Sequence, residues 1–359
     1  MSRQPRASGY FRTRYEQDLT LLTTRLERAS LAVFVLALLA FPFVASAFQL
    51  DLACQVFLAS VGALSLMLLT GYAGQISLGH AGLIAAGAFT VGILFRETNA
   101  PFWITLPAAA LVGALLGIIF GLPSLRLRGL YLAVSTLALH FVVVYLGGEY
   151  ETKRGFSTGI TIDAPVIAGF RLYGGKVWYF ILLAFAAAAL IICANLLRSR
   201  SGRAWRAIRA HETVAAALGI NVAAYKLLAF VISSAMAAVA GALFAYYRGF
   251  VSVEAFSLFL SIQYVAMIII GGMGSLLGAL LGAAFVTLFP YLIEALMQRL
   301  PNAQAYADVL FAVNYAAFGV VMIGFLIFEP QGLVGIWRRV QTYFLLWPFK
   351  QKPIAGGRK

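Results

Sequence analysis

The sequence predicts an all-α, polytopic integral membrane protein built as a helical bundle. Hydrophobic residues make up 62% of the 359 residues and charged residues only 11%, which is incompatible with the surface of an ordinary soluble domain. Ten apolar runs are close to the length of about 20 residues that a helix needs to cross a bilayer. The 34 glycines, against 11 prolines, are typical of membrane helices that pack closely through small residues.

The ten runs follow one another along the whole chain, and each is expected to be a helix. Glycines interrupt the chain near 71–80 and 271–275, so a re-entrant segment or a broken helix is an alternative to a full span at either place. We therefore expect about 8–10 transmembrane helices. The runs are 31–48, 52–70, 76–95, 103–122, 129–147, 177–197, 227–247, 256–272, 275–296 and 307–328.

Charge gives an independent prediction of orientation. If the N-terminus is cytoplasmic and all ten runs cross, 20 of the 27 Lys and Arg fall on the cytoplasmic side. Because positive residues near span ends concentrate in the cytoplasm, this division supports cytoplasmic N- and C-termini. The expected organisation is a cytoplasmic tail at 1–30, a transmembrane domain at 31–328 and a cytoplasmic tail at 329–359.

Two features of the predicted outer side need separate interpretation. Ala45-Ser46-Ala47 follows a basic region and an apolar run and so resembles a signal-peptidase site, but the preceding polar tail is long for a signal peptide. We expect an uncleaved first helix; cleavage at Ala47 would leave the remaining topology unchanged. The loop at 148–176 is polar and glycine-rich, and is either a contact surface for a soluble partner or substrate, or only a long connection.

The chain lacks the motifs of the common enzyme classes. There is no G-x-x-x-x-G-K-[ST] phosphate loop, no H-E-x-x-H and no C-x-x-C. The three histidines, His80, His140 and His211, have no metal-ligand spacing, and Cys54 and Cys193 lie in apolar runs. We predict no catalytic residue, no metal site and no cofactor.

Acidic residues are confined to the edges of the runs and to loops. An ion-coupled carrier usually places such groups inside the membrane, where they are costly unless used. The driving energy for any transport is therefore expected to come from another subunit.

The glycine-rich segment 71–82 contains the only cluster of polar side chains in the first four runs. Gln75, Ser77 and His80 are our candidates for lining a substrate pathway, in the manner of the discontinuous helices of transporters. The alternative is a tight interhelical turn whose polar groups cap helix ends. A similar pattern at 271–276 hints at a repeat.

Two glycine stripes are predicted to hold helices together. Residues four apart share one helix face, so each stripe would let a neighbouring backbone approach closely, within this chain or across a dimer interface. The stripes are Gly113, Gly117 and Gly121 on one helix, and Gly274, Gly278 and Gly282 on another.

The basic segment 198–226, called the basic loop below, interrupts the apolar sequence on the predicted cytoplasmic side. Ala204, Ile208, His211, Ala215 and Leu218 recur at helical spacing and predict one packed face with the arginines outside. Gly219 is expected to end this helix and Asn221 to cap the next. The basic loop either docks on a partner or faces lipid headgroups.

Five collinear motifs between residues 52 and 338 resemble the inner-membrane permease subunits of bacterial ABC importers for branched-chain amino acids, of the LivM type. The motifs are G-Y-A-G-Q-I-S-L-G-H-A-G (71–82), L-R-L-R-G-L-Y-L-A-V-S-T-L-A (125–138), S-G-R-A-W-R-A-I-R with A-A-L-G-I-N-V-x-x-Y-K-L-L-A-F (201–230), I-I-G-G-M-G-S-L-L-G (269–278) and F-E-P-Q-G-L-V-G-I (328–336). The resemblance implies a heterodimer with a related permease, two cytoplasmic ATP-binding cassette ATPases and a periplasmic solute-binding protein.

The resemblance also implies that the basic loop docks in a cleft of the ATPase. The residues predicted to contact the ATPase or to shape the loop are Arg203, Arg206, Arg209, Glu212 and Gly219. The usual E-A-A-x-x-x-G pattern is imperfect here, because position 213 is Thr and Glu212 lies one residue early. Competing interpretations are a carrier or channel acting alone, and a membrane enzyme or a structural assembly factor. The solute is expected to be a branched-chain amino acid or a related small molecule.

Overall fold

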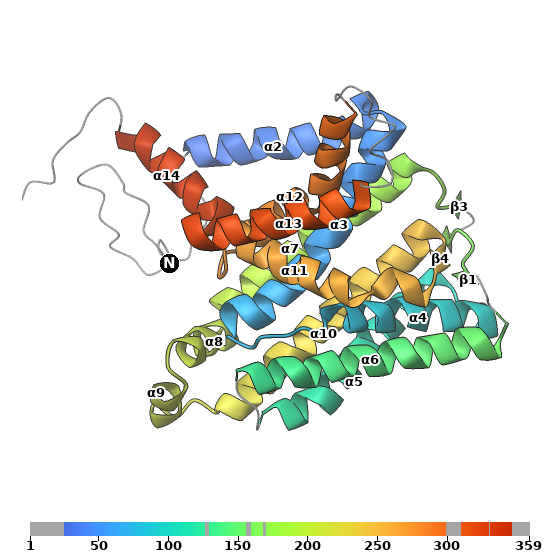
Figure 1. The fold of residues 1–359 in the computed structure, drawn as a ribbon, viewed down its shortest axis with the longest axis horizontal. Helices are drawn as coiled ribbons and strands as arrows, with labels where there is room; N and C mark the ends of the chain where they lie inside the picture. The colour runs from blue at the N-terminus through green and yellow to red at the C-terminus, as the bar shows by residue number, and fades with distance from the viewer. Residues whose placement is uncertain are drawn as a thin grey trace, which may run out of the picture.

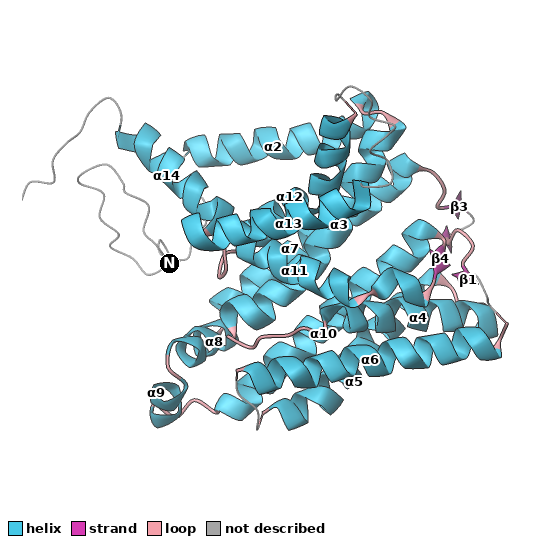
Figure 2. Ribbon diagram, viewed as in Figure 1, coloured by secondary structure: helices cyan, strands magenta, loops and turns pink. Residues whose placement is uncertain are grey.

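The computed structural model describes residues 25–125, 129–155, 159–167, 170–298, 310–329 and 331–346. In these residues the chain is almost entirely helical, so the predicted all-α membrane bundle is confirmed (Figures 1 and 2). Most of the predicted N-terminal tail, Arg126 and Arg128, and the end of the C-terminal tail lie outside the described residues.

Each of the ten apolar runs coincides with a helix. In chain order these helices are α2 (Arg25–Val44), α3 (Ala47–Leu66) continued by the π-helix η1 (Met67–Tyr72), α4 (His80–Thr98), α5 (Phe102–Ser124), α6 (Leu130–Lys153), α7 (Gly175–Arg198), α10 (Val222–Arg248), α11 (Leu258–Gly271), α12 (Leu276–Met297) and α13 (Leu310–Phe328). The remaining elements are α8 (Arg200–Ala210), α9 (Glu212–Ala217), the 3₁₀ helix η2 (Val253–Phe256), α14 (Gly332–Leu346) and the short strands β1 (Ile160–Thr161), β2 (Val166–Ile167), β3 (Phe170–Arg171) and β4 (Phe250–Val251).

Fewer helices are long enough to cross a membrane than there are apolar runs. Within the described residues seven helices are long and apolar enough to span, and there are eight if α13 and α14, which are bent by 53° relative to each other, together count as one span. The apolar part of α2 and the whole of α11 are shorter. The seven or eight spans lie at or just below the lower end of the expected range of eight to ten. The chain is a multi-pass membrane protein.

Local signals explain several helix ends. Ser46 caps α3 through a capping box: its hydroxyl accepts from Gln49 N–H, and the Gln49 side chain accepts from Ser46 N–H at 2.9 Å. The Ala45-Ser46-Ala47 sequence thus has a structural role at a helix start. The helix α6 extends to Lys153, so the first residues of the predicted 148–176 loop are helical.

Helix α10 is the centre of the bundle and packs against α5, α4 and α3 (Figure 1). The contact with α4 is close because both helices carry glycine there. A Cβ on Gly87 would collide with the Ala238 carbonyl, and one on Gly241 with the Ile84 carbonyl. This pair holds the two backbones together and was not singled out from the sequence.

The first glycine stripe lies on the face of α5 that meets α10. A Cβ on Gly113 would meet Ala238 and Ser234, one on Gly117 would meet Ser234 and Val231, and one on Gly121 would meet Leu227. All of these contacts are within the chain.

The second stripe is divided by the start of a helix. Gly278 and Gly282 lie on α12 against the backbone of α11. Gly274 precedes α12, in the turn 272–275, so its predicted place on the same helix is wrong. Its φ of +87° is a left-handed conformation, which explains why the turn needs glycine there.

Replacing Gly241 by alanine is expected to destabilise the protein by about 1–3 kcal/mol, because the added methyl group overpacks the α4 contact. The matched control is Gly319→Ala on α13, where a Cβ would meet nothing within 4 Å. Thermal melting of the two purified variants measures the difference. Equal melting temperatures would show that close packing at Gly241 contributes little.

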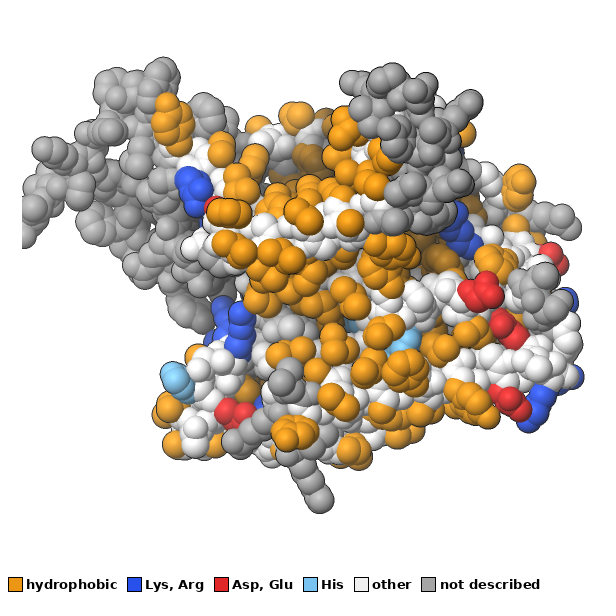
Figure 3. Space-filling view, viewed as in Figure 1, with side chains coloured by type: hydrophobic (Ala, Val, Ile, Leu, Met, Phe, Trp, Pro, Cys, Tyr) orange, Lys and Arg blue, Asp and Glu red, His pale blue; other side chains and the backbone are white. Residues whose placement is uncertain are grey.

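The bundle has two distinct ends (Figure 1). The loop end carries α8 and α9; the strand end carries β1 and β4, which pair antiparallel with Ile160 opposite Val251. Figure 3 shows apolar side chains over the middle of one face, basic side chains near α8, and charges of both signs at the strand end. Segments that the charge rule assigns to one side of the membrane therefore lie together at one end of the bundle.

Candidate functional site

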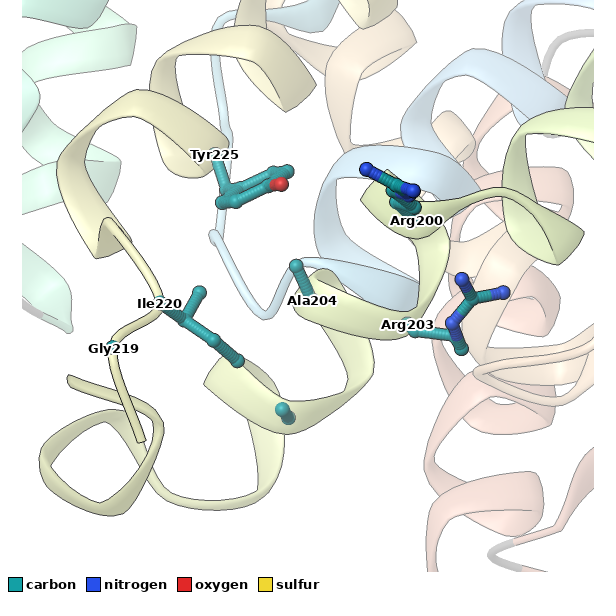
Figure 4. Close-up of a pocket in the computed structure, with 7 residues that line it drawn as sticks. Arg200, Arg203, Ala204, Gly219, Ile220 and Tyr225 are labelled. Carbon is teal, nitrogen blue, oxygen red and sulfur yellow. The ribbon is translucent and has the colours of Figure 1, made fainter. Parts of the chain in front are cut away.

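The basic loop folds into two short helices beyond the end of the bundle. The helix α8 follows α7 after a turn at Ser199, and α9 packs against α8 and the start of α10. Between α8 and the segment 219–225, which leads into α10, is a shallow hollow of about 480 Å³. Figure 4 shows Ile220 and Tyr225 pointing toward α8 across this hollow, with Gly219 at its edge.

The three predicted loop arginines donate hydrogen bonds to backbone carbonyls of their own chain. Arg203 Nη1 donates to the Arg198 carbonyl at 2.9 Å and Arg206 Nη2 to the Leu197 carbonyl at 3.2 Å. Both carbonyls lie at the end of α7, where the helix leaves acceptors unsatisfied and concentrates negative dipole charge. Arg209 Nη1 donates to the carbonyl of Gly71, far away in the sequence.

Two further contacts fix the basic loop against the bundle. Trp205 is completely buried, and its indole Nε1 donates to the Tyr225 carbonyl at 2.8 Å. Glu212 forms an ion pair of 2.8 Å with Lys226 on the first turn of α10. These contacts join α8 and α9 to α10, so the loop is a folded unit of the bundle.

Gly219 ends α9 as the sequence predicts. Its φ is +83°, and Gly219 N–H donates to the Ala216 carbonyl while Ile220 N–H donates to the Ala215 carbonyl. These two bonds form a Schellman motif, which favours glycine at the left-handed position. Asn221 caps α10, because its side chain accepts from Ala224 N–H.

The predicted packed face of the basic loop is only partly right. Ala204, Ile208 and Ala215 are buried, but His211 and Leu218 are exposed. The backbone at His211 is extended, with φ −155° and ψ 106°, and separates α8 from α9. As a result the tip of the loop presents Val214, 56% exposed, and Leu218, 75% exposed.

The two glycine-rich turns meet at the loop end. The segment 73–79 between η1 and α4 is not helical, and neither is the turn 272–275 between α11 and α12. Gly274 N–H donates to the Met67 sulfur, and a Cβ on Gly274 would lie 2.8 Å from Arg209 Nη1. Arg209 therefore contacts both turns, and it also packs on Gly74, where a Cβ would lie 3.3 Å from its side chain.

The candidate pathway residues are all buried. Gln75 Nε2 donates to the Lys226 carbonyl at 3.0 Å, which ties the first glycine turn to the basic loop. His80 Nε2 lies 2.9 Å from the Gly62 carbonyl and 3.1 Å from Ser65 Oγ. Ser77 Oγ and His80 Nδ1 have no hydrogen-bond partner among the described residues. Lining of a pathway by these three residues stays a prediction.

A cavity of about 290 Å³ lies inside the bundle toward the strand end, and none of Gln75, Ser77 and His80 lines it. Its lining comes from α3, α4, α10, η2, α11 and α12. Tyr264 forms part of this lining and packs edge-on against His80, with ring centroids 5.1 Å apart. His80 is thus separated from the cavity by one side chain.

Val214, Trp205 and the residues of this cavity were not predicted from the sequence. The helical spacing of apolar residues over 204–218 predicted one continuous helix with Leu218 on its packed face. The exposed tip was therefore not expected. The burial of Trp205 was detectable in principle, since a tryptophan among arginines is unusual on a solvated helix face.

Comparison with known proteins places the chain among transport proteins. Residues 48–327 match the family described as the branched-chain amino acid transport system permease component. The chain is 32% identical to the high-affinity branched-chain amino acid transport system permease protein LivM of Salmonella typhimurium, over 85% of this chain and 75% of the relative.

Further relatives agree with this result. LivM of Escherichia coli is 32% identical over 86% of this chain and 74% of its own length. The autoinducer 2 import system permease protein LsrC of Salmonella typhimurium is 27% identical over 63% of each chain. No solved structure matches the chain significantly. Because the family match covers most of the sequence, the chain belongs to the branched-chain amino acid transport system permease family.

Proposed function

We propose that this chain is a permease subunit of an ATP-driven importer in a bacterial inner membrane, forming the translocation pathway for branched-chain amino acids or related small solutes. Its partners would be a related permease, two ATP-binding cassette ATPases and a periplasmic solute-binding protein. The relatives named as transport-system permeases, and the one named as an import-system permease, support this proposal. So does the lack in the sequence of a phosphate loop of its own, which leaves ATP chemistry to other subunits.

The observation that carries the proposal is the exposed tip of the basic loop. Val214 and Leu218 are apolar, lie beyond the bundle and are held there by a folded support. Exposed apolar residues on a rigid element favour contact with a partner, because removing their apolar surface from water stabilises the complex. The charge rule assigns this end to the cytoplasm, the compartment of the ATPases.

The five predicted loop residues then shape the loop, and other residues make the contact. Arg203, Arg206 and Arg209 are engaged with backbone carbonyls, and Glu212 with Lys226, so these residues shape the loop. Gly219 sets the turn that ends α9. Contact with the ATPase falls to Val214 and Leu218.

Reconstitution tests the proposal. The chain is expected to co-purify with nucleotide-binding subunits, and the assembled transporter in liposomes is expected to take up leucine only with ATP and the binding protein. The control is the isolated chain in identical liposomes. Uptake by the isolated chain without ATP would contradict the proposal and favour a carrier acting alone.

A further inference from the structure

The cavity near the strand end combines an apolar wall with a polar rim. Its volume of about 290 Å³ is at the lower end of the range for small-molecule sites, roughly 300–1,000 Å³. The wall is contributed mainly by buried or half-buried apolar side chains, including Leu58, Ile84, Phe244, Leu260, Met267 and Val286. Such a wall favours a ligand with an aliphatic part.

The rim carries one cationic side chain and a network of polar groups. Arg248, at the end of α10, and Gln55 and Tyr291 all line the cavity. Gln55 Nε2 lies 3.1 Å from the Tyr291 hydroxyl and 2.7 Å from Asp51 Oδ2. Asp51 also accepts a hydrogen bond from the Tyr247 hydroxyl. A carboxylate is therefore fixed directly beside the cavity rim.

The two charges at this rim are close but do not form a tight pair. Arg248 Nη1 lies 4.0 Å from Asp51 Oδ1, longer than the roughly 2.7–2.9 Å of a charge-assisted hydrogen bond. Both side chains are about two-fifths exposed, so neither is sealed from a ligand. The guanidinium retains donors in a planar arrangement that matches a carboxylate.

We propose that this cavity binds a zwitterionic amino acid with an aliphatic side chain during transport. Arg248 would hold the α-carboxylate, Asp51 and the Gln55 carbonyl oxygen would accept from the α-ammonium group, and the aliphatic side chain would lie against the apolar wall. A solute without charge would leave both Arg248 and Asp51 without ligand partners. This inference rests on the proposed importer function and adds the substrate site to it.

The test uses the assembled transporter in liposomes with ATP, the binding protein and radiolabelled L-leucine, and measures leucine uptake and ATP hydrolysis in the same vesicles. Arg248→Gln is expected to lower the leucine taken up per ATP at least tenfold, because the carboxylate loses its charged partner. Ala255→Leu, which fills the cavity without changing charge, is expected to lower it similarly. Arg248→Lys is expected to fall between Arg248→Gln and the wild type.

The matched control is Lys153→Gln, which removes a positive charge from the same end of the bundle but away from the cavity, at an exposed ion pair with Glu149. It is expected to transport as the wild type does. Wild-type-like uptake by both Arg248→Gln and Ala255→Leu would overturn the site while leaving the importer function intact. An equal fall in uptake and in the basal ATP hydrolysis measured without leucine would also overturn it, since that pattern indicates a damaged assembly. A wild type without ATP-dependent uptake of any branched-chain amino acid or related small solute would overturn the proposed function itself.

Discussion

Leu218→Asp is expected to reduce the substrate-stimulated ATPase activity of the assembled transporter at least tenfold. Leu218 is 75% exposed at the tip of the basic loop, so the substitution leaves the fold of this chain intact. In the proposed complex, however, it replaces an apolar contact worth about 1.5–3 kcal/mol with a charge that has to be desolvated. Co-purification of the ATPase and its stimulated rate are the measurements.

Two controls separate docking from general damage. Leu218→Met keeps the side chain apolar and is expected to retain activity. Tyr173→Asp places a charge at another highly exposed position, 83% exposed and at the strand end, and is expected to have no effect on the ATPase rate. Full activity of Leu218→Asp would show that the tip of the loop does not enter the ATPase.

Arg209→Ala is expected to uncouple ATP hydrolysis from transport, with at least tenfold less solute moved per ATP. Arg209 is the side chain that reaches from the basic loop to both glycine turns, through the Gly71 carbonyl and the contact with Gly274. A hydrogen bond from a charged donor is worth about 1.5–3 kcal/mol, enough to change the coupling of two elements by a factor of ten or more. The ATPase can still dock, because the exposed tip is unchanged.

The control is Arg200→Ala, which removes the same charge from the other end of α8, where Arg200 lines the shallow hollow. Uptake and ATP hydrolysis are measured together for both variants. Arg209→Lys tests geometry, because a single ammonium group cannot reproduce the span of the guanidinium. A normal ratio of uptake to hydrolysis in Arg209→Ala would show that the contact with Gly71 contributes to the stability of the protein and not to coupling.

Much of the fold was predictable because its signals are local. Each apolar run is a helix, and the caps at Gly219 and Asn221 depend on residues within one turn of themselves. The turn at 272–275 was recognisable as a glycine cluster, but the short length of α11 was not, because the run 256–272 also includes Phe256 at the end of η2 and the two cap residues Ser257 and Gly272.

The site was less predictable because its contacts join distant segments. Gln75 is a polar residue in an apolar part of the sequence, which suggested that it contacts a solute. In the structure its side chain instead donates a hydrogen bond to the Lys226 carbonyl. Leu218 was assigned to the packed face because the helical phase was carried through His211, where the chain is extended. Arg248 and Asp51 lie at the ends of apolar runs, where a charged residue is ordinarily attributed to the boundary of the membrane.

The loop arginines have a consequence for how this protein tolerates substitution. Arg203, Arg206 and Arg209 all donate to backbone carbonyls, which are present whatever side chain the partner residue carries. These hydrogen bonds therefore do not depend on the partner's side chain, and loss of one of these arginines cannot be compensated by exchanging charges with a partner. Glu212 and Lys226 are a true side-chain pair, and a charge swap is possible there. Paired changes between related sequences would thus reveal the Glu212–Lys226 contact and leave the arginine contacts invisible.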